Sequence, residues 1–162
     1  MQDAEQEQPE AAESIRRFAD LSGDERVLVV GEAGLAPWFE PHVREVVEVD
    51  ADSLVDLPFD RGSFDLTATM GTLHRVRRPE LAFAELVRVT RLGGRLLVAD
   101  RLASIDPLPA MELDRLERER DPAHTRFLSD ADMRGAFEAN GLVLLHSQVD
   151  PRTGAGWYLL RR

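Results

Sequence analysis

The stretch that decides the fold runs from Val27 to Asp50 and reads VLVVGEAGLAPWFEPHVREVVEVD. It contains an apolar run, a glycine turn from Gly31 to Gly34, a short amphipathic segment, and a second apolar run that ends in an acid. Asp50 lies 19 residues after Gly31, close to the roughly 20 that separate the glycine turn from the ribose-binding acid in nucleotide-binding βαβ units. The spacing therefore predicts a ligand that contains a nucleoside.

Composition narrows the class of protein. The 162 residues suffice for one domain with a single core. A net charge of −10 argues against nucleic acid as a partner and favours a neutral or cationic small molecule. The lack of cysteine excludes disulfides and thiolate chemistry, and the four scattered histidines predict no metal site. No apolar run reaches the 18 or so residues of a membrane span and no signal peptide is evident, so we expect a cytoplasmic protein without a membrane partner.

The periodicity of apolar residues and the positions of proline and glycine predict the order of the helices and strands. Residues 1–13 are acidic and poor in large apolar groups, which predicts a disordered tail before a single domain over residues 14–162. Pro37 and Pro41 limit the segment between the first two strands to a turn or two of helix. The expected strands are 27–30, 43–49, 64–70, 95–100, 142–149 and 157–160, and the expected helices begin at Ser14, Pro79, Pro109 and Ser129. This order predicts an α/β fold, a Rossmann-like and mostly parallel sheet with a C-terminal antiparallel hairpin.

Several short motifs downstream of the glycine turn point to a family. They are Leu57-Pro58-Phe59 with Gly62-Ser63-Phe64-Asp65-Leu66, then Thr72-Leu73-His74-Arg75-Val76, Arg91-Leu92-Gly93-Gly94-Arg95-Leu96, and Asp121-Pro122-Ala123-His124 with Phe127-Leu128-Ser129. Together with the glycine turn and Asp50, they resemble class I S-adenosylmethionine-dependent methyltransferases. The likeness is greatest to the small-molecule branch of the ubiquinone and menaquinone biosynthesis type, and it covers residues 24–162.

The resemblance implies S-adenosylmethionine as cofactor, a small-molecule methyl acceptor, and a set of site residues. In the glycine turn, backbone N–H groups would face the carboxylate of the cofactor, Asp50 would bind the ribose, and residues after it would lie beside the adenine. The implied cofactor-binding residues are Gly31, Glu32, Ala33, Gly34, Asp50, Ala51, Asp52, Leu57, Met70 and Gly71. His74 is the first candidate for a substrate-facing general base and His124 the second. Each of these residues also has a purely structural interpretation, as a turn, a strand end or a loop histidine.

Two departures from the family pattern lead to further predictions. Relatives carry a helix and a third strand after the ribose acid, whereas only Ala51 to Asp56 separate Asp50 from Leu57 here. Losing an edge strand leaves no gap in the hydrogen-bond ladder, whereas losing an interior strand orphans two ladders. We therefore expect Val43–Val49 to be the second strand, now an edge and a possible seam for a homodimer or heteromer. An alternative register makes it the third strand, with Asp52 as the adenine-side acid.

The glycine turn itself is the second departure. Val29 stands where relatives have an acid and Ala33 where they have a glycine, so the cofactor loop is shortened and eroded. This leaves open a non-catalytic methyltransferase-like scaffold, or a partner subunit of an active relative. A nicotinamide-dependent oxidoreductase is a third hypothesis from the βαβ spacing alone. Glu32 counts against it, because that carboxylate would repel a pyrophosphate.

Overall fold

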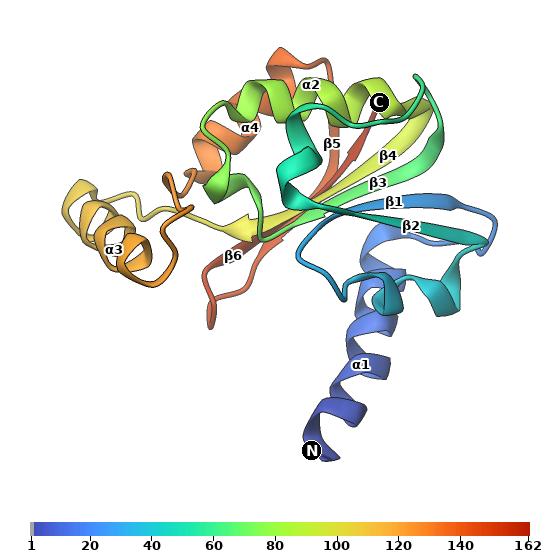
Figure 1. Cartoon of the computed structure of the whole chain (residues 1–162), viewed down its shortest axis with the longest axis horizontal. Coiled ribbons are helices and arrows are strands. Elements are labelled where there is room, and N and C mark those ends of the chain that lie inside the picture. Colours follow the sequence, from blue (N-terminus) through green and yellow to red (C-terminus); the bar gives the residue numbers. More distant parts are fainter. Residues whose placement is uncertain (1) are drawn as a thin grey trace.

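The computed structural model describes residues 2–162, with side chains from residue 10 onward. Six strands form one sheet in the order β2-β1-β3-β4-β6-β5, with helices on both faces (Figure 1). The strands are β1 (Arg26–Gly31), β2 (Glu45–Asp50), β3 (Phe64–Met70), β4 (Thr90–Arg101), β5 (Val143–Val149) and β6 (Ala155–Arg161). The helices are α1 (Gln2–Ala19), α2 (Pro79–Val89), α3 (Pro107–Arg120) and α4 (Asp130–Ala139), and the 3₁₀ turns are η1 (Ala36–Trp38), η2 (Glu40–His42), η3 (Ala51–Val55) and η4 (Leu73–Arg75).

Strand directions confirm the predicted fold class. The strands β2, β1, β3 and β4 run parallel to one another, whereas β6 is antiparallel to both β4 and β5. The hairpin closes the sheet on one side because no helix separates β5 from β6, and only a short turn joins them. The capping box expected at Ser129 and Asp132 is present at the start of α4.

The sheet lacks one edge strand and its helix, as predicted. Strand β2 is an edge, and it pairs in parallel with β1 from Arg26–Glu45 to Gly31–Asp50. The single turn η3 then leads from Asp50 toward β3. Pairing directly with β1 favours β2 as the second strand of the family pattern over the alternative register. Association of two chains through this edge stays a prediction.

The apolar run in β1 is buried on both faces of the sheet. Leu28 and Val30 belong to a core with residues of α2 and α4, whereas Val27 and Val29 belong to a core with residues of α1 and the η1–η2 segment. In Figure 1, α2 and α4 accordingly lie on one side of the sheet and α1 on the other. Burial on both faces explains why this strand reads as a continuous apolar run rather than an alternating one.

Two boundaries, the starts of α1 and β4, differ most from the predictions. Helix α1 begins at Gln2 rather than at Ser14, in a stretch rich in the helix formers Ala, Glu and Gln. The predicted disordered tail over residues 1–13 includes residue 1, which lies outside the described residues, and the division into tail and domain stays a prediction. Strand β4 begins at Thr90, directly after α2, instead of beyond the Gly93-Gly94 pair. Thr90 makes this early start possible, because its hydroxyl donates to the Leu86 carbonyl at 2.7 Å while its backbone pairs with Phe64.

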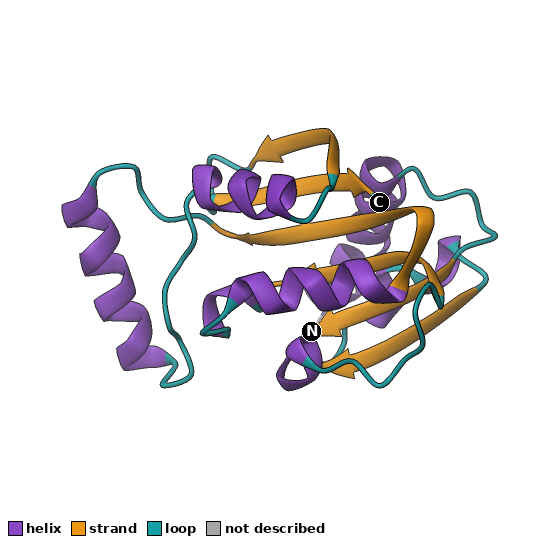
Figure 2. Ribbon diagram, turned by 90° about the horizontal axis from the view of Figure 1, so that it is seen from above, coloured by secondary structure: helices purple, strands orange, loops and turns teal. Residues whose placement is uncertain are grey.

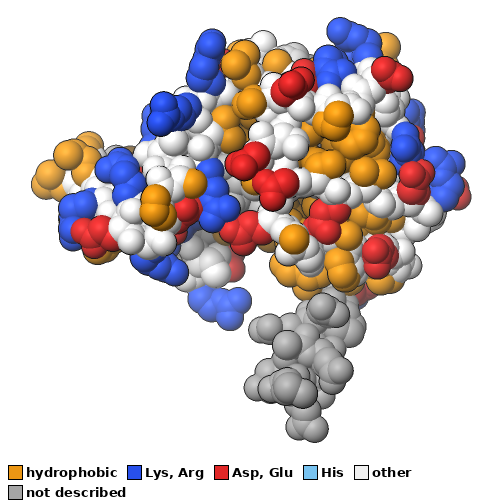
Figure 3. Space-filling model, in the orientation of Figure 1, with side chains coloured by type: hydrophobic (Ala, Val, Ile, Leu, Met, Phe, Trp, Pro, Cys, Tyr) orange, Lys and Arg blue, Asp and Glu red, His pale blue; other side chains and the backbone are white. Residues whose placement is uncertain are grey.

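Helix α3 projects away from the sheet (Figure 2) and has no buried residue. Apolar side chains are exposed on and just before it, at Ile105, Leu108 and Met111, and Figure 3 shows apolar side chains on this projection. Among the helices that the structure describes, none combines the length and the apolar character needed to cross a bilayer.

Candidate cofactor and active site

The carboxyl ends of three parallel strands meet at one edge of the sheet. Gly31, the last residue of β1, is in register with Asp50 at the end of β2 and with Met70 at the end of β3. Gly71 follows with a φ of 66°, which favours glycine, and turns the chain into the loop that carries η4. The sequence-predicted residues of these three strand ends are therefore neighbours, at the place where open α/β sheets bind ligands.

The turn after β1 is packed against the protein itself. A Cβ at Gly31 would lie 2.8 Å from a methyl carbon of Leu35 and 3.2 Å from the Met70 carbonyl oxygen, so only glycine fits there without a shift. Gly34 has a φ of 101°. Close packing at Gly31 and the positive φ at Gly34 therefore favour glycine at both positions, independently of any ligand.

The backbone N–H groups of this turn face a carboxylate of the chain. Those of Gly34, Leu35 and Ala36 donate to Glu48 Oε1 at 3.1, 2.8 and 3.2 Å. The sequence interpretation expected these groups to face the carboxylate of a cofactor; here they face Glu48, and cofactor binding at the turn stays a prediction. Because Glu48 lies on β2 two residues before Asp50, its side chain points to the same face as that of Asp50 and reaches the turn from the neighbouring strand.

Next to Asp50 lies a cavity of about 320 Å³. Its lining is largely apolar on the η3 side and basic on the η4 side: Ala51, Asp52, Leu54, Val55, Thr72, Arg75, Val76, Arg77, Arg78 and Leu81. Asp50 itself caps η3, because its Oδ1 accepts the Asp52 N–H at 2.9 Å. Ala51 and Asp52 therefore reach the cavity as expected, whereas Leu57 is buried in the core and Leu54 and Val55 line the cavity instead.

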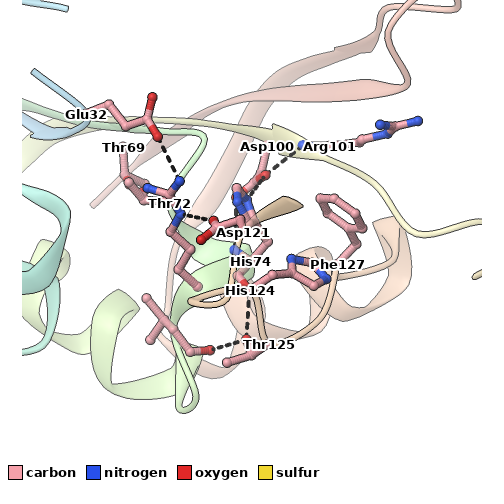
Figure 4. Close-up of polar contacts among 12 residues, drawn as sticks. Glu32, Thr69, Thr72, His74, Asp100, Arg101, Asp121, His124, Thr125 and Phe127 are labelled. Carbon is pink, nitrogen blue, oxygen red and sulfur yellow. Dashed lines mark hydrogen bonds and ion pairs between the residues drawn. The ribbon is translucent and has the colours of Figure 1, made fainter. Parts of the chain in front are cut away.

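An ion-pair chain crosses from the glycine turn to the loop after α3. Arg75 pairs with Glu32 at 2.8 Å and with Asp121 at 2.6 Å (Figure 4). The amide of Ala123 and the Arg75 guanidinium together hold the pKa of Asp121 below its ordinary value. Arg75 is thus engaged on both sides, and it links Glu32 in the glycine turn to Asp121 at the end of α3.

His74 is held by a buried carboxylate. Its Nδ1 lies 2.9 Å from Asp100 Oδ1, and its backbone N–H donates to Asp100 Oδ2 at 3.2 Å. Burial of the ring acts to lower the pKa of His74, but the hydrogen bond and negative charge of Asp100 outweigh it, so the pKa lies above the ordinary value. With Nδ1 held by Asp100, Nε2 is the ring nitrogen available to a substrate.

The buried His124 forms a second histidine–carboxylate pair, with the partly exposed Asp114, beside the first. Its Nε2 lies 2.8 Å from Asp114 Oδ1, and its ring centroid is 5.4 Å from that of His74. Its Nδ1 has no hydrogen-bond partner among the described residues. Phe127 packs against both rings, with centroids 5.3 Å from His74 and 4.6 Å from His124. The structure thus brings the two sequence-predicted histidines together, as Figure 4 illustrates.

Three acids of this site were missed in the sequence: Glu48, Asp100 and Asp114. Asp100 lies near the end of β4, and the rule that identified the ends of β1, β2 and β3 as ligand-facing applies equally to that strand. Glu48 and Asp114 give no such signal, since one looks like a solvated strand residue and the other like one of many charges on α3.

S-adenosylmethionine fits one half of this site. Asp50 at the strand end and the largely apolar cavity beside it suit a ribose and an adenine. The turn amides, which would hold the carboxylate of the cofactor, are bound to Glu48 instead. The residues present would therefore suit the adenosine half of the cofactor, whereas its carboxylate would have to replace Glu48 at the turn amides.

Comparison with known proteins agrees with the fold. Residues 30–98 match the family model described as a methyltransferase domain. The chain is 29% identical over 153 residues to the uncharacterized methyltransferase YcgJ of Bacillus subtilis, and 37% identical over 73 residues to a demethylmenaquinone methyltransferase of Thermobifida fusca. The crystal structure of YcgJ superposes with a TM-score of 0.80 at 20% identity, covering 94% of this chain and 98% of that one.

The sequence matches cover only part of those relatives. The YcgJ match takes in 78% of this chain and 60% of the relative, and the T. fusca match takes in 45% and 29%. Residues 30–98 thus resemble a methyltransferase domain, and the fold is that of the YcgJ crystal structure.

Proposed function

We propose that the chain transfers a methyl group from S-adenosylmethionine to a small molecule, with His74 as the general base. The observation that carries this proposal is the Asp100–His74 pair, in which His74 lies in the loop directly after β3 and Asp100 near the end of β4. Thr72 and Arg75, on either side of this histidine in sequence, line the cavity beside Asp50. A base in that position suits an acceptor whose nucleophilic atom carries a proton, such as a hydroxyl.

The residues of the chain would divide the work between binding and proton transfer. The cofactor supplies an electrophilic methyl group on a sulfonium. Asp50 would accept hydrogen bonds from the ribose hydroxyls, and Ala51, Leu54 and Val55 would bury the adenine. Asp100 fixes the ring orientation of His74 and strengthens it as a base, so that Nε2 can take the acceptor proton near neutral pH. Otherwise the protein mainly has to align the reactants and exclude water.

Methyl transfer from radiolabelled S-adenosylmethionine to a panel of small phenols, carboxylic acids and amines tests this proposal. For any acceptor found, we expect His74→Gln to lower kcat by about 10²–10⁴-fold while cofactor binding persists, the usual contribution of a general base. His42→Gln, outside the site in η2, is the matched control and is expected to keep wild-type kcat. Full activity of His74→Gln would refute the role of His74 as the general base.

A non-catalytic role is the second candidate, and Glu48 is the observation that favours it. The amides of the turn are already bound to a carboxylate of the chain, so the turn would contribute less to the affinity for the cofactor. A scaffold or partner subunit would show neither methyl transfer with any acceptor nor stabilisation by the cofactor. The same assay, run alongside thermal unfolding at ~1 mM cofactor, separates the two candidates, because binding with a Kd of about 10 μM adds ~2.7 kcal/mol of stability.

A further inference from the structure

Glu48 occupies an anion site that the chain itself builds. Three consecutive backbone N–H groups converge on one oxygen of its side chain, at 2.8 to 3.2 Å. Consecutive amides that point into one concavity are the arrangement by which protein backbones bind anions. The anion here comes from the adjacent strand rather than from a ligand.

This contact lies inside the region assigned to the cofactor. Glu48 lines a hollow of about 230 Å³ at the ends of β1 and β2, together with Gly31, Ala33, Val49 and Asp50. A ligand whose ribose is bound by Asp50 would direct its 5′ substituent toward this hollow and the glycine turn. A carboxylate on that substituent would need the same turn amides that Glu48 occupies. The two carboxylates would then lie close together, and their negative charges would repel each other.

We propose that Glu48 sets the ligand class of this site by selecting against a carboxylate on the 5′ substituent of the nucleoside. A ligand with an adenosine half and a tail that bears an amine but no carboxylate binds the site as it stands. S-adenosylmethionine and its demethylated product bind only after Glu48 leaves the amides. This inference rests on the proposed function in one respect, the assignment of the nucleoside to Asp50.

A pair of ligands that differ only in the carboxylate tests the inference by titration calorimetry. They are S-adenosylhomocysteine and its decarboxylated counterpart, S-adenosyl-3-thiopropylamine, each measured against wild type, Glu48→Ala and Glu48→Gln. We expect Glu48→Ala to tighten S-adenosylhomocysteine binding about tenfold, the effect of freeing amides for a charged acceptor. Affinity for the decarboxylated ligand should stay within about twofold. Glu48→Gln keeps an acceptor for the turn and should shift the ratio in the same direction by less.

Glu45→Ala is the matched control on the same strand. It removes a carboxylate that pairs with Arg26 at the opposite end of β2, at 2.9 Å, and should leave both affinities unchanged. An unchanged ratio of the two affinities in Glu48→Ala would overturn the role of Glu48 while leaving the proposed function intact. Failure of every variant to bind either ligand would overturn both.

Discussion

Replacing Asp100 in the Asp100–His74 pair should change both the free energy of unfolding and the pKa of His74, and the two changes must agree with each other. Asp100 is buried and accepts three hydrogen bonds, from His74 Nδ1 at 2.9 Å, the His74 amide at 3.2 Å and the Arg101 amide at 2.8 Å. Asp100→Asn keeps one acceptor oxygen, so the two bonds to Oδ1 fall from charge-assisted to neutral ones, while the amide nitrogen cannot accept the His74 N–H. At about 1 kcal/mol of loss per bond, for the two shorter bonds, we expect a destabilisation of about 2 kcal/mol at alkaline pH.

The destabilisation must grow as pH falls. Since the pKa of His74 in the folded protein lies above its ordinary value, which is about 6.5, the protonated ring stabilises the fold. That stability is fully present below the unfolded pKa and is lost as pH rises through the folded pKa. Without the charge of Asp100, burial and the positive charge of Arg75 lower the pKa of the ring, and of the named neighbours only Asp121 acts to raise it. The cost of Asp100→Asn should therefore be larger at pH 5 than at pH 9.

Urea unfolding at a series of pH values, with NMR titration of the His74 ring in both proteins, measures the two quantities independently. Each unit by which Asp100→Asn lowers the pKa of His74 should appear as about 1.4 kcal/mol of extra destabilisation at low pH. His42→Gln serves as a control for general titration effects. A cost that is the same at pH 5 and pH 9, or a pKa unmoved by the substitution, would refute the argument that Asp100 supports the charge of His74.

Other predictions concern the fold that holds the site. Gly94→Ala should destabilise the protein by about 1–3 kcal/mol in urea unfolding, because its Cβ would lie within 2.9 Å of the Asp65 carbonyl oxygen. Gly135→Ala, which has open space around it in α4, should stabilise the protein by about 0.5–1 kcal/mol. Equal effects of the two substitutions would contradict the packing argument. Ser129→Ala should cost about 1 kcal/mol by the same measurement, and no change would mean that the capping box adds nothing. Tyr158→Phe removes a 2.7 Å bond to Asp130 and should cost about 1–2 kcal/mol; a neutral result would show that water replaces that bond.

The sequence predicted the parts of the fold that depend on local rules. Strand β3 was expected over 64–70 and is found there, and the two prolines after β1 do restrict that connection to 3₁₀ turns. The start of β4 was missed because glycines end helices more often than a threonine does. Thr90 ends α2 through a hydroxyl bond to the preceding turn, and only the pairing with β3 makes that visible.

The candidate site was predictable only as far as the strand ends. The convergence of Gly31, Asp50 and Met70 follows from parallel pairing, which periodicity reveals. The engagement of Glu48 with the turn amides is different in kind. It depends on how close a residue of β2 comes to the turn that follows the neighbouring strand β1. No pattern in one sequence encodes that distance. The same holds for Asp114, which reaches His124 across ten residues of sequence.

The central claim is that the strand ends bind the adenosine half of a cofactor through Asp50. Titration calorimetry with S-adenosylmethionine on wild type, Asp50→Ala and Asp50→Asn tests it most directly. Asp50→Asn keeps an acceptor for the Asp52 amide, so it separates ligand binding from the capping of η3. We predict saturable one-to-one binding that weakens at least about tenfold in both variants. Absence of binding to the wild type at ~1 mM cofactor, or equal affinity in all three proteins, would contradict the account.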